Sequence, residues 1–233
     1  MTEQHEYPVD FVVPVDDEER SRGLAALGVV LFAKVILLIP HLFLLLLYFF
    51  VVQVVVWIGY WYILIQGGKP FWVENLELIF LEWGSRVFAW FTSTTDVYPT
   101  FGTDENHPAQ VLVEEAPEPQ NRVLIVAQIG ISAVVAAGLF AADEFTVWEA
   151  VVWGLVGIGA ARALFAAPHL FILMWLTIGT LFAAWFGYLM ILINGRLPLS
   201  LHWYFVGFHR WWARTWAWIA ALTDEYPPFS LQR

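Results

Sequence analysis

Two histidines are the residues in this sequence best suited to holding a cofactor. His41 and His169 each follow a proline at the start of a long apolar stretch, one in each half of the chain. A neutral imidazole can ligate haem iron or the magnesium of a chlorophyll-type pigment. Each ring can equally bond a backbone carbonyl at a helix corner or lie at the level of the lipid headgroups. We expect no cofactor, with a haem or chlorophyll-type pigment as the alternative.

Four basic residues recur at the same spacing and are candidates for binding an anion or a lipid headgroup. Lys34 matches Arg162, and Arg86 matches Arg214. A cation near the end of an apolar helix can extend its side chain to the interface, or it can hold a phosphate or carboxylate. Arg86 and Arg214 stand among tryptophans, so each guanidinium can stack on a ring or bind a lipid phosphate. Structural and ligand-binding interpretations stay open for all four.

The remaining polar residues form no recognised catalytic pattern. The chain has no cysteine, which excludes thiolate metal sites and iron–sulfur clusters. It has no phosphate-binding loop, metalloprotease motif or Ser-His-Asp pattern. His202 and His209 share a helix face but have no counterparts in the first half of the chain, and Asp96 and Asp224 precede Tyr-Pro in what we expect to be turns. We expect neither enzymatic activity nor a metal site. The net charge of −10 argues against binding to nucleic acid.

The elements that position these residues are expected to lie in a membrane. The chain is 60% hydrophobic and only 14% charged, whereas soluble domains are about a quarter charged. Between Val35 and Tyr62 only His41 and Gln53 are clearly polar, and about 20 apolar residues suffice for one helical span. The sequence therefore predicts an all-α integral membrane protein, multi-pass, in the inner (cytoplasmic) membrane of a bacterium.

The second half of the chain aligns with the first without a gap. Pro40-His41-Leu42-Phe43 falls on Pro168-His169-Leu170-Phe171, and in the same register Tyr98-Pro99 falls on Tyr226-Pro227. Shared hydrophobicity does not explain matches of Pro-His, Trp, Arg and Tyr-Pro in one register, so we interpret them as a tandem duplication. The preceding polar arms align in a different register, which places Phe11 on Val111 and leaves extra residues in the second copy. The expected organisation is an acidic arm (1–22), a first membrane repeat (23–101), an acidic linker (102–122), an extra transmembrane helix (123–146) and a second repeat (147–233).

Each repeat is expected to be a helical hairpin followed by an amphipathic interfacial helix. Helix A (23–39; 147–167) is predicted to end at a corner or kink at Pro-His, and helix B (41–65; 169–193) at a Gly-Pro turn. The third segment (71–92; 199–222) mixes charged and aromatic residues, which favours a helix in the plane of the interface. With the extra helix this gives about five spans and two antiparallel repeats, an arrangement known from inverted-repeat carriers. If the third segment also spans, there are seven spans and the repeats are parallel.

The repeated motif resembles a family of bacterial multi-pass membrane proteins known as domain of unknown function 4389. The residues that carry the resemblance are Pro-His between apolar helices, Ile-Leu-Ile-x-Gly-Arg-x-Pro (191–198) and Thr-Asp-x-Tyr-Pro-Pro-Phe (223–229). The first copy departs from the motif, with Gly67-Gly68-Lys69 and with Thr100 in place of the second proline. The resemblance implies a membrane location and a helical architecture, and it carries no established activity.

These observations lead to three hypotheses for function. The first is a non-catalytic accessory or scaffold subunit that lies in the lipid bilayer and packs against other membrane protein subunits. The second is an inverted-repeat channel or carrier for a small anion, with Lys34 and Arg162 near its path. The third is a subunit that binds haem or a pigment through His41 and His169.

Overall fold

The computed structural model describes residues 7–15, 19–30, 33–114, 120–141, 146–149 and 162–232, which are mostly helical. Two of the helices, α2 and α6, are long and apolar enough to cross a membrane. The elements in chain order are β1 (Val9–Val12), α1 (Arg22–Val29), α2 (Lys34–Gln66), α3 (Phe71–Phe91), β2 (Gln110–Val113), α4 (Arg122–Ala141), α6 (Ala167–Asn194) and α7 (Leu199–Ile219).

The long helices end where the sequence predicts Gly-Pro turns. Gly67 caps α2 with a φ of 92° and Gly195 caps α6 with a φ of 73°, a left-handed conformation that favours glycine. Pro70 and Pro198 then precede α3 and α7 in an extended backbone, so the missing proline N–H costs no helical hydrogen bond.

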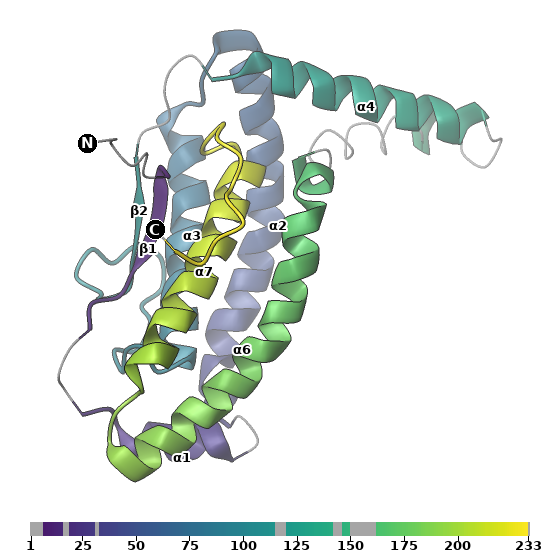
Figure 1. Ribbon diagram of the computed structural model, residues 1–233. Helices are drawn as coiled ribbons and strands as arrows, with labels where there is room; N and C mark the ends of the chain where they lie inside the picture. The colour runs from purple at the N-terminus through teal and green to yellow at the C-terminus, as the bar shows by residue number, and fades with distance from the viewer. Residues whose placement is uncertain are drawn as a thin grey trace, which may run out of the picture.

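The helices form two antiparallel hairpins, α2 with α3 and α6 with α7, and α3 and α7 pack together at the centre (Figure 1). Helices α2 and α6 form an outer layer on one side of this central pair and run in opposite directions. Helices α3 and α7, which form the predicted third segment, lie lengthwise against α2 and α6. The interfacial position of this segment stays a prediction. The buried faces of α3 and α7 carry many large aromatic side chains, among them Trp83, Trp90 and Trp211, which pack best along the full length of a neighbouring helix.

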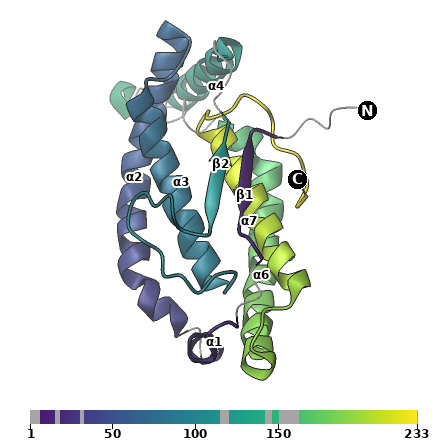
Figure 2. The ribbon, with the colours of Figure 1, turned by 90° about the vertical axis from the view of Figure 1, so that its left-hand side faces the viewer.

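A two-stranded ribbon covers the other side of the central pair, so the fold is not purely α (Figure 2). Strands β1 and β2 are antiparallel, and Phe11 pairs with Val111. These two residues are equivalent in the alignment of the arms. Such a pairing is expected if an approximate two-fold axis passes through this pair and exchanges the two hairpins. The described parts of the two acidic arms therefore form this ribbon and contribute to the core. Val9 and Phe11 have no exposed surface, because their side chains join the central apolar core.

We call α1, α2 and α3 the first unit and α4, α6 and α7, with the residues between them, the second unit. The helix that follows each arm packs on the hairpin of the other unit. Helix α1 lies against α6, where Ala25 and Tyr188 belong to one apolar cluster. The start of α4 lies against α2, where Ile125 and Tyr60 share another. Gly28 allows the closest approach, because a Cβ at this position would lie 2.4 Å from the ring of Tyr188.

The sequence predicts a corner or a kink at Pro-His. The corner is wrong for Pro40-His41, where α2 continues, whereas in the second copy α6 begins at Ala167, beside Pro168-His169. The chain turns between the end of α1 at Val29 and the start of α2 at Lys34, and Pro40 lies inside α2. A proline in the second turn of a 33-residue helix removes one hydrogen bond from the helix, which the packing of the remaining turns offsets. Pro168 is near the first turn of α6, where the missing N–H has no cost.

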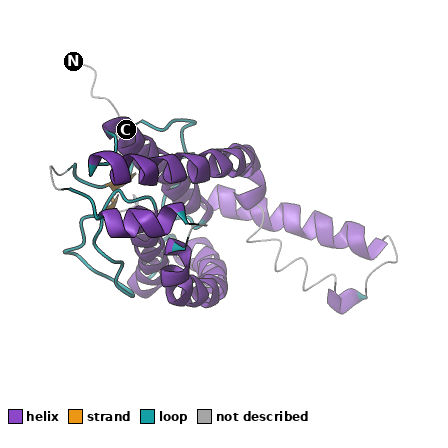
Figure 3. Cartoon of the chain, turned by 90° about the horizontal axis from the view of Figure 1, so that it is seen from below, coloured by secondary structure: helices purple, strands orange, loops and turns teal. Residues whose placement is uncertain are grey.

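Helix α4 projects from the bundle on the side away from the ribbon (Figures 1 and 3). It corresponds to the extra helix predicted at 123–146. Its first residues, 122–129, follow the second arm as α1 follows the first, and the helix then continues to Ala141. Most of the predicted helix 147–167 lies outside the described residues. Five or seven spans are not confirmed, because among the described residues only α2 and α6 are long and apolar enough, and the apolar part of α4 that is described covers Arg122–Val134.

Candidate functional sites

Lys34 binds the carboxyl end of α3. Its ammonium group is fully buried at the start of α2, donates hydrogen bonds to the carbonyl oxygen of Trp90 and, at 2.8 Å, to Ser93 Oγ, and lies 4.3 Å from the centre of the Trp90 ring. The last carbonyls of a helix carry partial negative charge, so a cation stabilises them. Lys34, at the start of α2, thus caps the carboxyl end of α3, the next helix along the chain.

Arg162 performs the same task for α7 in the second unit. Its guanidinium donates to the carbonyl oxygens of Trp218 at 2.7 Å and Thr223 at 3.2 Å, and it forms an ion pair with Asp224 at 2.9 Å. The side chain is 1% exposed. These contacts favour a structural role for Lys34 and Arg162 over the predicted binding of an anion or a headgroup.

Arg86 and Arg214 are also turned inward, but their partners differ. Arg86 donates to the carbonyl oxygen of Gly102 and lies 3.8 Å from Glu82. Arg214 donates to the carbonyl oxygens of Val9 at 3.0 Å and Gln232 at 2.9 Å. Both are almost fully buried, and these contacts favour a structural role for each guanidinium.

His41 and His169 sit in two matching aromatic boxes. Trp83 Nε1 donates to His41 Nδ1 at 3.0 Å, and Trp211 Nε1 donates to His169 Nδ1 at 2.8 Å. A stacked phenylalanine ring covers each imidazole at 4.1 Å and 3.8 Å respectively. Because Nδ1 accepts a hydrogen bond, each neutral ring carries its proton on Nε2. Both Nε2 atoms are buried and have no partner among the described residues.

The structure does not bring the two histidines together. His41 is near the start of α2 and His169 is near the start of α6, and these helices run in opposite directions (Figure 1). The rings therefore lie at opposite ends of the bundle, and one haem could not take both as axial ligands. Within the described residues no group of three or more metal-ligating side chains gathers.

The recurring aspartates anchor the chain where the arms enter the helices. Asp96 accepts a hydrogen bond from the backbone N–H of Ser21, and Asp224 accepts one from that of Asn121. The two donors are equivalent in the alignment of the arms. Both contacts join segments distant in the sequence, so they add a long-range anchoring role to the turn expected at each aspartate.

Sequence reasoning missed a row of donors on α7 that binds the free edge of β1. His202, Arg210 and Arg214 contact the carbonyl oxygens of Val13, Phe11 and Val9. Arg210 also forms a buried ion pair with Asp10. Arg214 matches Arg86 in the alignment, whereas His202 and Arg210 have no basic counterpart in the first copy. Their partners can be predicted only once the position of the ribbon is known.

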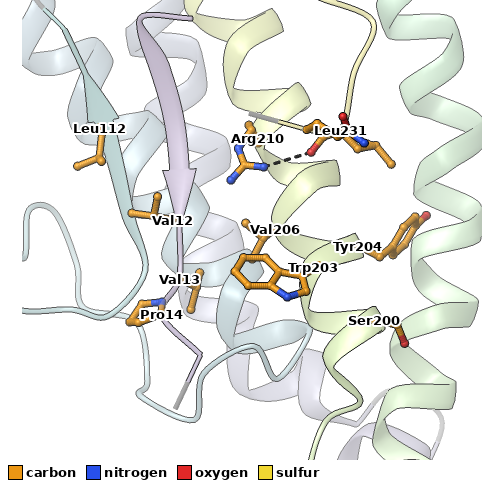
Figure 4. Close-up of a pocket in the computed structure, with 11 residues that line it drawn as sticks. Val12, Val13, Pro14, Leu112, Ser200, Trp203, Tyr204, Val206, Arg210 and Leu231 are labelled. Carbon is orange, nitrogen blue, oxygen red and sulfur yellow. Dashed lines mark hydrogen bonds between the residues drawn. The ribbon is translucent and has the colours of Figure 1, made fainter. Parts of the chain in front are cut away.

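Beside this row lies a half-open groove of about 900 Å³. Valines of β1 and α7 line it, Trp203 projects over it, and Arg210 closes one end by donating to the carbonyl oxygen of Leu231 at 3.1 Å (Figure 4). The groove is largely apolar, and the guanidinium of Arg210 that lines it pairs with Asp10 and with the carbonyl oxygen of Leu231.

The first unit contains a buried ion pair that the sequence did not suggest. Lys69 Nζ lies 2.6 Å from Glu77 Oε2, and neither side chain is exposed. Lys69 also donates to the carbonyl oxygen of Ala220, next to the end of α7. Burial raises the pKa of Glu77 to about 7, against the lowering effect of Lys69. The equivalent residues of the second unit are apolar, Leu197 and Phe205.

These features define a mostly helical protein that has two helices long and apolar enough to cross a membrane and that uses its recurring polar groups internally. Residues 158–230 match the family described as Domain of unknown function (DUF4389). This range lies in the second unit and supports the family resemblance predicted there. No curated protein and no solved structure matches the chain.

Proposed function

We propose that the chain is a non-catalytic accessory or scaffold subunit of a membrane complex, built by duplication of one helical unit. The duplication is supported by contacts that recur at equivalent positions of the two units. Tyr98 donates to the carbonyl oxygen of Leu37 at 2.6 Å, and Tyr226 donates to that of Phe165 at 2.9 Å. The two tryptophan–histidine hydrogen bonds described above are a second such pair.

One observation carries the proposal for a scaffold. The four recurring basic residues donate hydrogen bonds to the protein's own backbone, and each recurring histidine accepts one from a tryptophan. The outer faces of α2 and α6, in contrast, present large apolar side chains to the surroundings. On α6 the exposed set includes Trp175, Phe182 and Phe186. Contiguous apolar surface of this kind is typical of contact with lipid or with another protein. The lipid bilayer and other membrane subunits, in the inner membrane of a bacterium, are the partners we propose.

The test is purification from native membranes in a mild detergent. We expect a stoichiometric partner to copurify with the wild-type chain. Replacing Trp175, Phe182 and Phe186 with alanine should release that partner, while Phe43→Ala and Phe50→Ala on α2 serve as the matched control for general loss of apolar surface. A wild-type protein that purifies as a single species without any stoichiometric partner contradicts the proposal.

The opposite directions of α2 and α6 favour a second candidate, an inverted-repeat carrier or channel for a small anion. In that case proteoliposomes would show anion flux that Lys34→Met or Arg162→Met abolishes. The same purified sample decides the third hypothesis, since a haem or pigment subunit must absorb visible light and a colourless protein cannot contain either group.

A further inference from the structure

The structure contains two apolar surfaces that point in different directions. Helices α2 and α6 run along the bundle, whereas α4 lies across it (Figures 1 and 3). A membrane normal can follow only one of these directions. The positions of the charged and hydrogen-bonding groups therefore determine which helix crosses the bilayer and which helices lie parallel to it.

Helix α4 has the properties of a membrane span. Its 20 residues extend about 30 Å at 1.5 Å per residue, which equals the thickness of the hydrocarbon core. No charged residue stands between Arg122 and Asp143 in the sequence. Val123 and Val134 are each 74% exposed. A helix that lies in the interface needs a charged or strongly polar face, and α4 has none over its described length, so it is stable only when lipid or protein surrounds it.

The ribbon side of the bundle cannot face hydrocarbon. Glu105 and Glu114 are exposed there. Burial lowers the pKa of Arg86 in α3, and the carboxylates of Glu82 and Asp104 oppose this effect. If α2 followed the membrane normal, these carboxylates and the two-stranded ribbon would lie beside the bundle at the depth of the lipid tails. Exposed carboxylates and open sheet edges are not tolerated there without a covering protein.

The opposite side is suited to lipid along its whole length. Ile39, Leu46 and Val54 lie on one face of α2 and are 55%, 55% and 58% exposed. At 33 residues α2 is about 50 Å long, well beyond the thickness of the hydrocarbon core. An apolar helix of this length fits readily when it lies parallel to the membrane plane. The ribbon is then in water, on the far side of α3 and α7.

We infer that α4 crosses the bilayer, while α2 and α6 lie flat in one leaflet with the ribbon facing the aqueous phase. The approximate two-fold axis then runs along the membrane normal. This assigns the lipid-facing surface of the protein, and it holds whether or not the chain is a scaffold subunit. It also differs from a carrier arrangement, in which the axis of an inverted repeat lies in the membrane plane.

The chain has no cysteine, so single-cysteine variants report on one position each. We propose to attach a nitroxide to Ile39→Cys, Leu46→Cys, Val54→Cys, Val123→Cys and Val134→Cys. The variants are reconstituted in phosphatidylcholine–phosphatidylglycerol vesicles. The immersion depth of each label follows from its relative collision rates with oxygen and with a water-soluble nickel complex. Glu105→Cys is the control for a label in water.

We expect the three α2 labels to share one depth, and the two α4 labels to differ by about 16 Å, the rise of the helix between them. If α2 crosses the bilayer instead, Leu46→Cys will be deepest. Ile39→Cys and Val54→Cys will then lie near opposite interfaces, about 22 Å apart. That result overturns the inference, as does equal depth for the two α4 labels. Free access of the nickel complex to all five positions overturns it as well.

Discussion

The buried pair Lys69–Glu77 gives a sharp test of how the two units are related. In the second unit the same two positions hold Leu197 and Phe205, and the neighbouring glycines are packed alike. A Cβ on Gly59 would lie 3.0 Å from Lys69, and one on Gly187 would lie 3.0 Å from Leu197. An apolar side chain therefore fits at position 69. Lys69→Leu keeps this packing but removes the charge that compensates Glu77.

The expected cost of Lys69→Leu is large. Breaking a buried ion pair by removing one partner costs about 3–5 kcal/mol, because the other charge stays buried. For a chain of this size that corresponds to a loss of roughly 6 °C or more in Tm. The double variant Lys69→Leu, Glu77→Met removes both charges and should recover most of this loss. Unfolding is followed in mild detergent by tryptophan fluorescence, with denaturant as the variable.

The loss should depend on pH, and the direction follows from the pKa of Glu77. Burial raises this pKa, so the folded chain holds a proton that the unfolded chain releases. Without Lys69 the pKa rises further. Lys69→Leu should then be least destabilised below about pH 4.5, the ordinary pKa of the carboxyl, and should lose stability as pH rises through 7. An equal destabilisation at pH 5 and pH 8, or a double variant no more stable than the single one, would refute this reasoning.

Three further predictions concern other buried contacts. Gly28→Leu should destabilise the protein by about 1–3 kcal/mol, because the new side chain meets the ring of Tyr188; denaturant unfolding measures the change. Trp211→Phe should cost about 1 kcal/mol by removing the hydrogen bond to His169 without altering the visible absorption spectrum. Burial lowers the pKa of His209 to about 3, so stability present above pH 6.5 is lost as pH falls towards 3, and His209→Leu should weaken this loss in acid unfolding.

The first two of these variants each have a control, and the third has an outcome that would contradict it. Gly84→Leu adds the same side chain where nothing lies within 4 Å, so equal destabilisation at both glycines would contradict the role of the close approach. Trp203 is 53% exposed, and Trp203→Phe should leave stability within experimental error. An unchanged acid midpoint in His209→Leu would show that this buried ring does not contribute to acid unfolding.

The parts of the fold that depend on local sequence could be predicted. Long runs of apolar residues marked α2 and α6, and glycine followed by proline marked their ends, because both signals act within a few residues. The corner at Pro-His was misplaced because proline permits two outcomes, a helix start or an interior position. In the first copy α2 begins at Lys34, whose ammonium group binds the end of α3, and Pro40 takes the interior position.

The ribbon and the sites depend on contacts between distant segments. The apolar triplets at Phe11 and Val111 were visible in the aligned arms, but so short a run does not distinguish a strand from a solvated segment. The alignment pairs Lys34 with Arg162, and each of them donates to a carbonyl oxygen at the end of α3 or α7. Their partners could not be predicted, since a basic residue carries no information about which helix end it will reach until the hairpins are placed.

The exchange of α1 and α4 between the two hairpins has a consequence for any shorter polypeptide of this kind. A chain with one unit would carry both an entering helix and the apolar surface that such a helix covers. In the arrangement seen here, the entering helix of such a chain would not reach the apolar surface of its own hairpin. Two such chains would therefore be complementary to each other, each inserting its first helix into its neighbour, and the ribbon would join them as an isologous dimer. The present protein would then be that dimer made permanent by a covalent link.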